Sequence, residues 1–271
     1  MIKLVAIDLD GTLFDKKKNV SNENIKAIKK CKENGIKIVI ATGRPISGVL
    51  PLLEELDLTS DDDYVITYNG AKVFNVGTNK IIFSSTITGC DTKKIYQESL
   101  RLNVNFHAFR KNEELITPKH NPYTEIEATI NHVEDHIFDP NLINDDDEFL
   151  KAMMVDKEEN ITKTIPLVSK YFVDNFSMVR SSKIFLEFLN KNTHKGHALT
   201  ALANYLNIDI KDTMAIGDAG NDLPMILTSG IGVAMENAFP DIKEKADFIT
   251  LSNENSGVAY AINKFIFEEQ K

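Results

Sequence analysis

The sequence is poor in cysteine, with only Cys31 and Cys90 in 271 residues. Two cysteines without a paired spacing supply neither a disulfide framework nor a zinc motif. Long apolar runs are also missing, because the first run is too short for a signal peptide and ends at Asp8. No stretch approaches the roughly 18 apolar residues of a membrane helix. We therefore expect a reduced, cytoplasmic protein without a membrane partner.

Positive charge is in deficit as well. The chain has 31 lysines and arginines against 40 acidic residues, a formal net charge of −9. A nucleic-acid-binding protein normally shows a basic patch. The lysines at 16–18 and 29–30 stand among acidic neighbours, and we interpret them as solvated surface. An acidic protein that binds phosphate esters must neutralise them locally, with a metal ion or a few placed cations.

Strands and helices alternate at both ends of the chain. Short apolar runs, typical of buried parallel strands, cover residues 3–8, 36–41, 64–67, 213–217 and 231–235. Helical spacing or capping signals cover residues 21–34, 47–56, 197–206, 223–228 and 257–267. This alternation predicts an α/β fold with a Rossmann-like parallel-sheet core.

The middle of the chain has a different pattern. Most of its segments are typical of strands, and two helical stretches, near 91–102 and 157–172, interrupt them. We therefore predict that residues 85–190 form an α+β cap domain inserted into the core. The core then consists of residues 1–84 and 191–271. A chain of 271 residues is long enough for two domains of modest size, the core and the cap.

Two carboxylates directly follow the first predicted strand, in Asp8-Leu9-Asp10-Gly11-Thr12. In open α/β sheets, ligands bind beyond the carboxyl ends of the strands. Two carboxylates at this place suit a hard cation, a covalent nucleophile or proton transfer. An ordinary Asp-Gly turn would also account for these residue types.

Three further segments carry polar groups at strand ends or helix starts. Thr42 follows the second strand, Lys195 begins a helix, and the loop 217–222 supplies Asp218 and Asn221. Each has a simpler explanation alone: a helix cap, a solvated lysine or a capping loop. All of them occur together, however, and their chemistry fits one reaction. The carboxylates suit a metal and a nucleophile, and the cation, amide and hydroxyl suit a phosphate.

In this combination the chain resembles the haloacid dehalogenase-like phosphatases, and among them the Cof-type branch with a large inserted cap. The motifs that carry the resemblance are Asp8-Leu9-Asp10-Gly11-Thr12, Thr42-Gly43-Arg44, Thr67-Tyr68-Asn69-Gly70-Ala71, Lys195-Gly196, Gly217-Asp218-Ala219-Gly220-Asn221-Asp222 and Gly232-Val233-Ala234-Met235. The resemblance covers essentially the whole chain, and the nearest look-alikes are bacterial sugar phosphatases. It implies a Mg²⁺-dependent phosphatase for small phosphorylated metabolites, with sugar phosphates foremost.

The resemblance also implies a role for each motif residue. Asp8 would be the nucleophile that forms an aspartyl-phosphate, and Asp10 the general acid and base. Mg²⁺ would be bound by Asp8, by Asp218 and by the backbone carbonyl of Asp10. The transferring phosphoryl group would be held by the backbone N–H of Leu9 and by Thr42, Gly43, Lys195 and Asn221. Asp222 would support the metal site or Lys195.

The chain departs from these motifs at one place, in the loop that carries Asp218. Ala219-Gly220 replaces a bulky polar pair that look-alikes often carry, which would leave ligation intact but loosen the loop. In the cap, His107 and Arg110 would either meet the substrate or be solvated. Arg44 and Asn69, at the border of the cap, are further candidates for substrate contact.

Two other functions remain open at this point. In a phosphomutase of the phosphomannomutase type, the aspartyl-phosphate would return to the sugar instead of meeting water. A non-catalytic, phosphate-binding regulatory module would keep the fold without turnover, although such a module has little need for Asp10. For the phosphatase we expect a small phosphate ester as substrate, no nucleic acid or membrane as partner, and a monomer or weak homo-oligomer.

Overall fold

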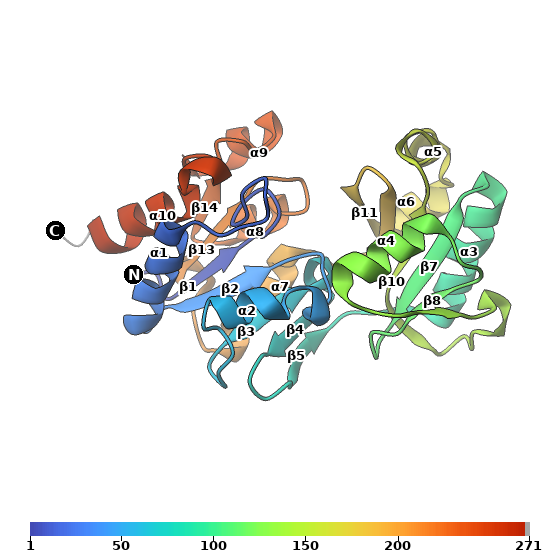
Figure 1. Ribbon diagram of the computed structural model, residues 1–271, viewed down its shortest axis with the longest axis horizontal. Helices are drawn as coiled ribbons and strands as arrows, with labels where there is room; N and C mark the ends of the chain where they lie inside the picture. The colour runs from blue at the N-terminus through green and yellow to red at the C-terminus, as the bar shows by residue number, and fades with distance from the viewer. Residues whose placement is uncertain (269–271) are drawn as a thin grey trace. The chain divides into compact units, whose positions relative to one another are not determined.

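The structure is a computed structural model that describes residues 1–268. The chain divides into two compact units (Figure 1). The first unit contains Met1–Gly43, Leu50–Phe83 and the C-terminal part from His194, and the second contains Arg44–Val49 and Ser84–Thr193. The short segment Arg44–Val49 therefore groups with the second unit, whereas the sequence analysis had counted it with the core.

An eight-stranded sheet forms the centre of the first unit. In order across the sheet its strands are β15 (Phe248–Ile249), β14 (Ile231–Ala234), β13 (Thr213–Gly217), β1 (Leu4–Ile7), β2 (Lys37–Ala41), β3 (Tyr64–Thr67), β4 (Lys72–Asn75) and β5 (Ile81–Ser84). Neighbours from β15 to β3 pair in parallel, and β4 runs antiparallel to β3. This arrangement confirms the predicted α/β fold with a parallel-sheet core.

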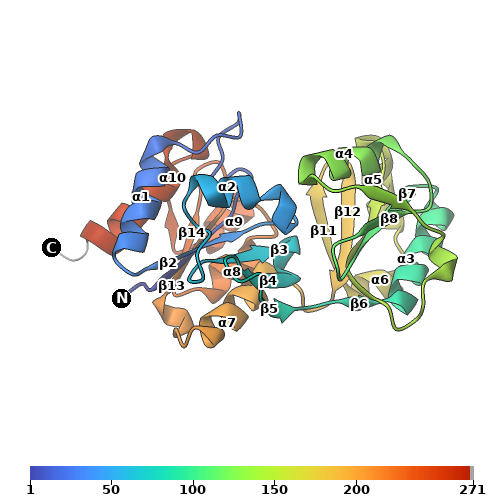
Figure 2. The same ribbon diagram turned by 60° about the horizontal axis from the view of Figure 1, so that its bottom comes forward.

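Helices precede or follow the parallel strands of the first unit along the chain. They are α1 (Asn22–Glu33), α2 (Leu50–Glu55), α7 (Lys195–Tyr205), α8 (Leu223–Thr228), α9 (Pro240–Lys245) and α10 (Gly257–Ile262), which continues as a π-helical turn over Asn263–Glu268. Figures 1 and 2 show α1 and α10 packed side by side. The predicted helix at 47–56 is wrong in its first turn, where Ile46–Gly48 forms a 3-10 turn before α2.

The second unit has its own, mostly antiparallel sheet. Along its main path the strands are β11 (Phe176–Ser182), β12 (Phe185–Asn190), β10 (Glu148–Val155), β7 (Asn105–Arg110), β8 (Leu115–Thr117) and β9 (Asp135–Ile137), and β6 (Ile87–Thr88) pairs with β10. Its helices are α3 (Gly89–Leu102), α4 (Pro122–Asn131), α5 (Glu158–Thr164) and α6 (Lys170–Asn175). This is the predicted α+β arrangement.

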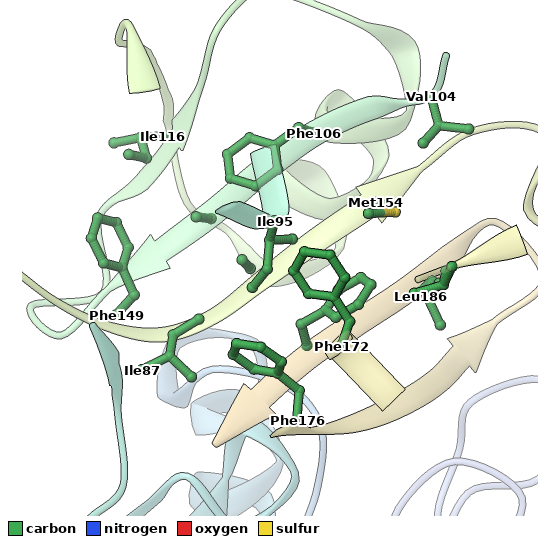
Figure 3. Close-up of a cluster of buried hydrophobic side chains, with 14 of the residues drawn as sticks. Ile87, Ile95, Val104, Phe106, Ile116, Phe149, Met154, Phe172, Phe176 and Leu186 are labelled. Carbon is green, nitrogen blue, oxygen red and sulfur yellow. The ribbon is translucent and has the colours of Figure 1, made fainter. Parts of the chain in front are cut away.

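Alternation along the strands gives the second sheet two different faces. Even-numbered residues of β7, of β12 and of β10 after its register shift at Phe149–Lys151, such as Phe106, Met154 and Leu186, join an apolar core (Figure 3). Successive side chains of a strand point to opposite faces. The odd-numbered residues between them, among them His107 and Lys151, are buried outside that apolar core.

Helix α4 covers part of the odd-numbered face and was not anticipated. Its start carries a recognisable signal: Asn121 accepts the backbone N–H groups of Tyr123 and Thr124, and Pro122 occupies the first turn. An asparagine cap followed by proline is a favourable helix start. The signal was overlooked because the helix has only ten residues and lies within a strand-rich region.

No helix within residues 1–268 is long and apolar enough to cross a membrane. Cys31 is buried and Cys90 partly buried, and both are free thiols. Burial raises the pKa of the Cys31 thiol to about 12, so this thiol has little nucleophilic character near neutral pH.

Candidate active site

Three adjacent strands of the first unit bring the motif residues to one edge of the sheet. β1 pairs with β13 on one side and with β2 on the other. Asp8 follows β1, Thr42 follows β2 and Asp218 follows β13. Because parallel strands end at the same edge, segments far apart in the sequence meet there.

Carboxylates of three aspartates form a tight group at this edge. Oxygens of Asp8, Asp218 and Asp222 lie within 4.8 Å of one another, a distance at which they could hold a metal ion. Asp8 and Asp222 are buried, and Asp218 is partly exposed. The hydroxyl of Thr12 donates to Asp218 Oδ1 over 3.0 Å. The site therefore offers a cation only oxygen ligands.

Lys195 is the buried cation of the same cluster. Its Nζ donates to Asp8 Oδ1 over 2.5 Å and to Asp222 Oδ1 over 2.7 Å, and the residue has no exposed surface. The next residue must be small, because a Cβ at Gly196 would lie 2.4 Å from the carbonyl oxygen of Pro224. The close packing of α7 on α8 thus places Lys195 between two carboxylates.

Asp222 acts mainly on its protein neighbours. Its Oδ2 accepts the backbone N–H groups of Asp218 and Ala219, both over 3.0 Å, and its Oδ1 accepts from Lys195. Both oxygens are therefore engaged by protein donors. These bonds hold the loop that carries Asp218. The loop residues Ala219 and Gly220 have no polar side chains that could do so.

Electrostatics distinguish this cluster from an ordinary ion pair. Burial raises the pKa of Asp8 to about 8, with Asp222 and Asp218 adding to the rise and Lys195 opposing it. Burial and Asp222 raise the pKa of Asp218 to about 6. Three carboxylates thus face one lysine in a desolvated place, which leaves an excess of negative charge. A divalent cation at the carboxylates would remove that excess.

The Asp10 side chain lies apart from this cluster. Its carboxylate pairs with Lys18 and is 42% exposed. Lys18 is exposed, as expected of a solvated surface, and its ion pair with Asp10 lies on that surface. Lys18 has a φ of 64°, a left-handed conformation that lysine rarely adopts, and nothing in the sequence marks it. The backbone of Asp10 forms a β-bridge with Phe14.

The residues expected to hold a phosphoryl group gather around Asn69. The backbone N–H of Asn69 donates to the Thr42 carbonyl over 3.0 Å, and Asn221 Nδ2 donates to Asn69 Oδ1 over 3.0 Å. A Cβ at Gly43 would lie 3.0 Å from the Asn69 amide. Thr42, Gly43, Asn69 and Asn221 therefore come together. Leu9, next to Asp8, has a buried side chain.

His107 and Arg110 have partners inside the second unit instead. His107 is fully buried, with Nδ1 3.0 Å from Thr124 Oγ1 and Nε2 3.1 Å from Met153 Sδ. Arg110 pairs with Glu114 and Asp147, each over 3.2 Å. Both side chains therefore have partners of their own, and their role as substrate contacts stays a prediction. Arg44 also belongs to the second unit, where Nη1 lies 3.5 Å from the Gly48 carbonyl oxygen.

Comparison with known proteins agrees with this geometry. A family described as haloacid dehalogenase-like hydrolase matches residues 5–262. The chain is 40% identical to YxeH of Bacillus subtilis (strain 168), over 98% of this chain and 99% of that protein. It is 31% identical to the 5-amino-6-(5-phospho-D-ribitylamino)uracil phosphatase YwtE of the same organism, over 98% of both chains.

A solved structure extends the comparison to three dimensions. The subclass IIB sugar phosphatase BT4131 superimposes with a TM-score of 0.80 at 25% identity, covering 97% of this chain and 98% of that one. The match includes both units and not the sheet of the first unit alone. Together with the whole-chain relatives, this makes the chain a phosphatase that belongs to the haloacid dehalogenase-like hydrolase family.

Proposed function

We propose that this phosphatase hydrolyses small phosphorylated metabolites, foremost sugar phosphates, with Mg²⁺ bound and with Asp8 as a covalent nucleophile. The observation that carries the proposal is the buried Asp8 carboxylate, which contacts Lys195 and lies within 4.8 Å of the oxygens of Asp218 and Asp222. The similarity to YwtE and BT4131, whose names specify phosphorylated ribityl and sugar compounds, supports this substrate class.

The donor set fits Mg²⁺. Asp8 and Asp218 supply carboxylate oxygens, and the backbone carbonyl of Asp10 is the third protein ligand that we propose. Such all-oxygen sets suit a hard cation that keeps several waters. Asp222 is a poorer ligand, because protein donors already engage both of its oxygens. When bound, the ion would offset negative charge on the phosphoryl oxygens.

Asp8 makes the first covalent bond in this proposal. A phosphate monoester carries about two negative charges near neutral pH, so it repels a carboxylate. Lys195 reduces that repulsion, because its ammonium group lies against Asp8. An Asp8 oxygen then bonds to phosphorus while the bond from phosphorus to the alcohol oxygen breaks. The product of this step is an aspartyl-phosphate and a free alcohol.

Asp10 moves the proton in both steps. It gives a proton to the departing alcohol oxygen, and later takes one from the water that attacks the aspartyl-phosphate. That attack releases inorganic phosphate and restores the Asp8 carboxylate. The exposed position of the Asp10 carboxylate beside Lys18 allows it to exchange protons with solvent.

The remaining contacts divide between phosphate and leaving group. We assign the phosphoryl oxygens to Lys195, Asn221, Thr42 and the backbone around Gly43 and Leu9. We propose that residues 85–190 act as a cap that selects the leaving group, with Asn69 and Arg44 as candidate contacts. Asn69 is a candidate because it joins two of the proposed phosphate-binding residues, Thr42 and Asn221.

A phosphate-release screen tests the proposal. Sugar phosphates, nucleotides and cofactor phosphates are incubated with the enzyme and Mg²⁺, and then with EDTA. We expect turnover of sugar phosphates with Mg²⁺ and near-complete loss with EDTA, restored by added Mg²⁺. An Asp8→Asn preparation controls for contaminating phosphatases. Full turnover in metal-free buffer would refute the metal assignment.

The same screen separates the phosphatase from a phosphomutase. A mutase would convert a sugar monophosphate into its isomer, would need a sugar bisphosphate as primer and would release little phosphate. Steady release of one phosphate per substrate consumed supports hydrolysis. Accumulation of a bisphosphate would instead favour the mutase.

A further inference from the structure

Two asparagines outside the motifs hold the turn that follows Asp10. Asn237 Nδ2 donates to the Gly11 carbonyl over 2.8 Å, and Asn253 Nδ2 donates to the Phe14 carbonyl over 2.8 Å. The two asparagines are also joined, because the backbone N–H of Asn253 donates to Asn237 Oδ1 over 2.9 Å. The bonds therefore fix the orientation of the Asn237 amide and hold the turn at both ends.

The turn from Gly11 to Phe14 is bonded to Leu9, Asp10 and Asp218 of the site. The Leu9 carbonyl accepts the backbone N–H of Phe14 over 2.9 Å, and Phe14 bridges to Asp10. Within the turn, Thr12 donates to Asp218. A displacement of the Gly11 or Phe14 carbonyl must therefore move the backbone that carries Asp10.

The turn has little room to adjust by itself. Gly11 has a φ of +90°, a conformation that favours glycine. A Cβ at this position would lie 2.5 Å from Asp218 Oδ2. On one side the turn contacts the carboxylate of Asp218. On the other, the two asparagines bind its carbonyl groups.

We propose that Asn237 and Asn253 are positioning residues that hold the backbone of Asp10 in place for proton transfer, while the Asp10 carboxylate itself pairs with Lys18. Neither side chain contacts Asp8, Lys195 or Asp218 in the hydrogen bonds described above, so both act through the turn. This inference rests on the proposed function, because it is the proton transfer by Asp10 that would be supported. The Asn237 side chain is exposed, and its replacement opens no cavity in the core.

Asn237→Asp is the sharpest test. It keeps the oxygen that accepts from Asn253, but it removes the donor to Gly11 and sets a carboxylate against a carbonyl. Asn253→Asp does the same toward Phe14 and serves as the second variant if the first does not fold. Asn255→Asp is the matched control, because it adds the same charge nearby and Asn255 Nδ2 donates only to Ser252 Oγ.

The readout is the dependence of kcat/KM on the leaving group, because kcat/KM covers the step in which the alcohol departs and not the later hydrolysis of the aspartyl-phosphate that both substrates share. Proton transfer contributes about 10²–10⁴-fold, so we expect Asn237→Asp to lose a part of it, about 10-fold or more, on a sugar phosphate. On nitrophenyl phosphate, whose leaving group needs no proton, we expect little loss. In combination with Asp10→Asn, Asn237→Asp should cause no further loss, because the group that it holds in place is gone. The rise in melting temperature with Mg²⁺ alone should match that of the Asn255→Asp control.

Other outcomes would overturn the inference. Equal losses on both substrates, losses that multiply with those of Asp10→Asn, or wild-type activity of Asn237→Asp and Asn253→Asp would each do so. The proposed function fails separately: if Asp10→Asn itself shows no dependence on the leaving group, Asp10 is not the acid. If Asp10→Asn shows that dependence and the asparagine variants do not, only the positioning role is lost.

Discussion

Each unit of the molecule contains a buried lysine between two carboxylates. In the first unit Lys195 contacts Asp8 and Asp222 over 2.5 and 2.7 Å. In the second, Lys151 contacts Glu127 and Glu187 over 3.2 and 3.1 Å. Both lysines are almost completely buried. The two clusters therefore share chemistry and burial, and they differ in where their strands place them.

Position along the strand explains the difference. Asp8 stands just past the end of β1, where loops meet and a third carboxylate, Asp218, is at hand. Lys151 and Glu187 lie within β10 and β12, and α4 supplies Glu127 from above the sheet. A side chain within a strand is covered by whatever packs on that face, whereas a side chain at a strand end borders space for a ligand.

Charge balance follows the same division. In the second cluster two carboxylates, Glu127 and Glu187, face Lys151; burial raises the pKa of Glu127, and Lys151 opposes that rise. In the first unit the additional carboxylate of Asp218 leaves an excess that a metal ion could offset. We infer that the first cluster, with its third carboxylate at a strand end, can receive a cation, whereas the second is an internal ion-pair cluster. The following predictions test this contrast.

The largest expected effect comes from exchanging one carboxylate for an amide in each cluster. Asp8→Asn removes the nucleophile, so we expect no detectable turnover and no trapped phosphoenzyme. Glu187→Gln makes the same chemical change beside Lys151 and should keep turnover of nitrophenyl phosphate. Phosphate release and rapid acid quench measure both variants. An active Asp8→Asn enzyme would show that the mechanism is not covalent at Asp8.

The next effect concerns the aspartate that lies outside the first cluster. Asp10→Asn keeps the backbone carbonyl but removes proton transfer, and we expect a loss of about 10²–10⁴-fold on a sugar phosphate. The loss should be smallest on nitrophenyl phosphate, whose leaving group is stable without a proton. Comparison of kcat/KM on the two substrates checks this, because kcat/KM reports the step in which the leaving group departs. A variant that is dead on both, beside an active Asp8→Asn, would reverse the two roles.

In the second cluster the expected effect is on stability. Lys151→Met leaves two buried carboxylates without a cation, and removing one partner of a buried ion pair costs about 3–5 kcal/mol. Urea denaturation measures the loss. Lys157→Met is the control, because Lys157 forms only an exposed pair with Glu159, and exposed pairs contribute about 0–1 kcal/mol. Wild-type stability of Lys151→Met would show that the cluster is not held by charge.

The smallest effect is a pH dependence of folding stability. Burial, and then Lys151, lower the pKa of His107 to about 3, below the value of about 6.5 for an unfolded histidine. Between these values the unfolded chain binds a proton that the folded chain excludes, so stability falls as pH drops below about 6.5. From pH 7 to pH 5 this group accounts for about 2 kcal/mol.

His107→Leu should remove that contribution. Measured by urea denaturation at pH 7 and pH 5, wild type should lose about 2 kcal/mol more than the variant between the two values. Identical losses would show that the buried imidazole is protonated in the folded state after all.

Much of the architecture was predictable, because it depends on local patterns. Apolar runs that end in Asp8 or Asp218 predict parallel strands with carboxylates at their ends, and the change of pattern near residue 85 predicts the insertion. Short elements such as α4 and β9 were missed, since few residues carry their signal. The ion pair between Lys18 and Asp10 was not predicted either, and nothing in the residue type of Lys18 indicates its positive φ.

The sequence by itself determined which reactive residues are present and which strand each of them follows. It therefore also determined which edge of the sheet carries them. Only the tertiary structure decided which of those groups touch. Lys195 and Asp8 are 187 residues apart, and no local pattern states that their atoms meet. The same holds for His107, whose polarity suggested a substrate contact and whose burial beneath α4 gives it a partner in Thr124. The burial of a side chain and its contacts depend on segments that are far apart in the sequence, so they are fixed only when the chain has folded.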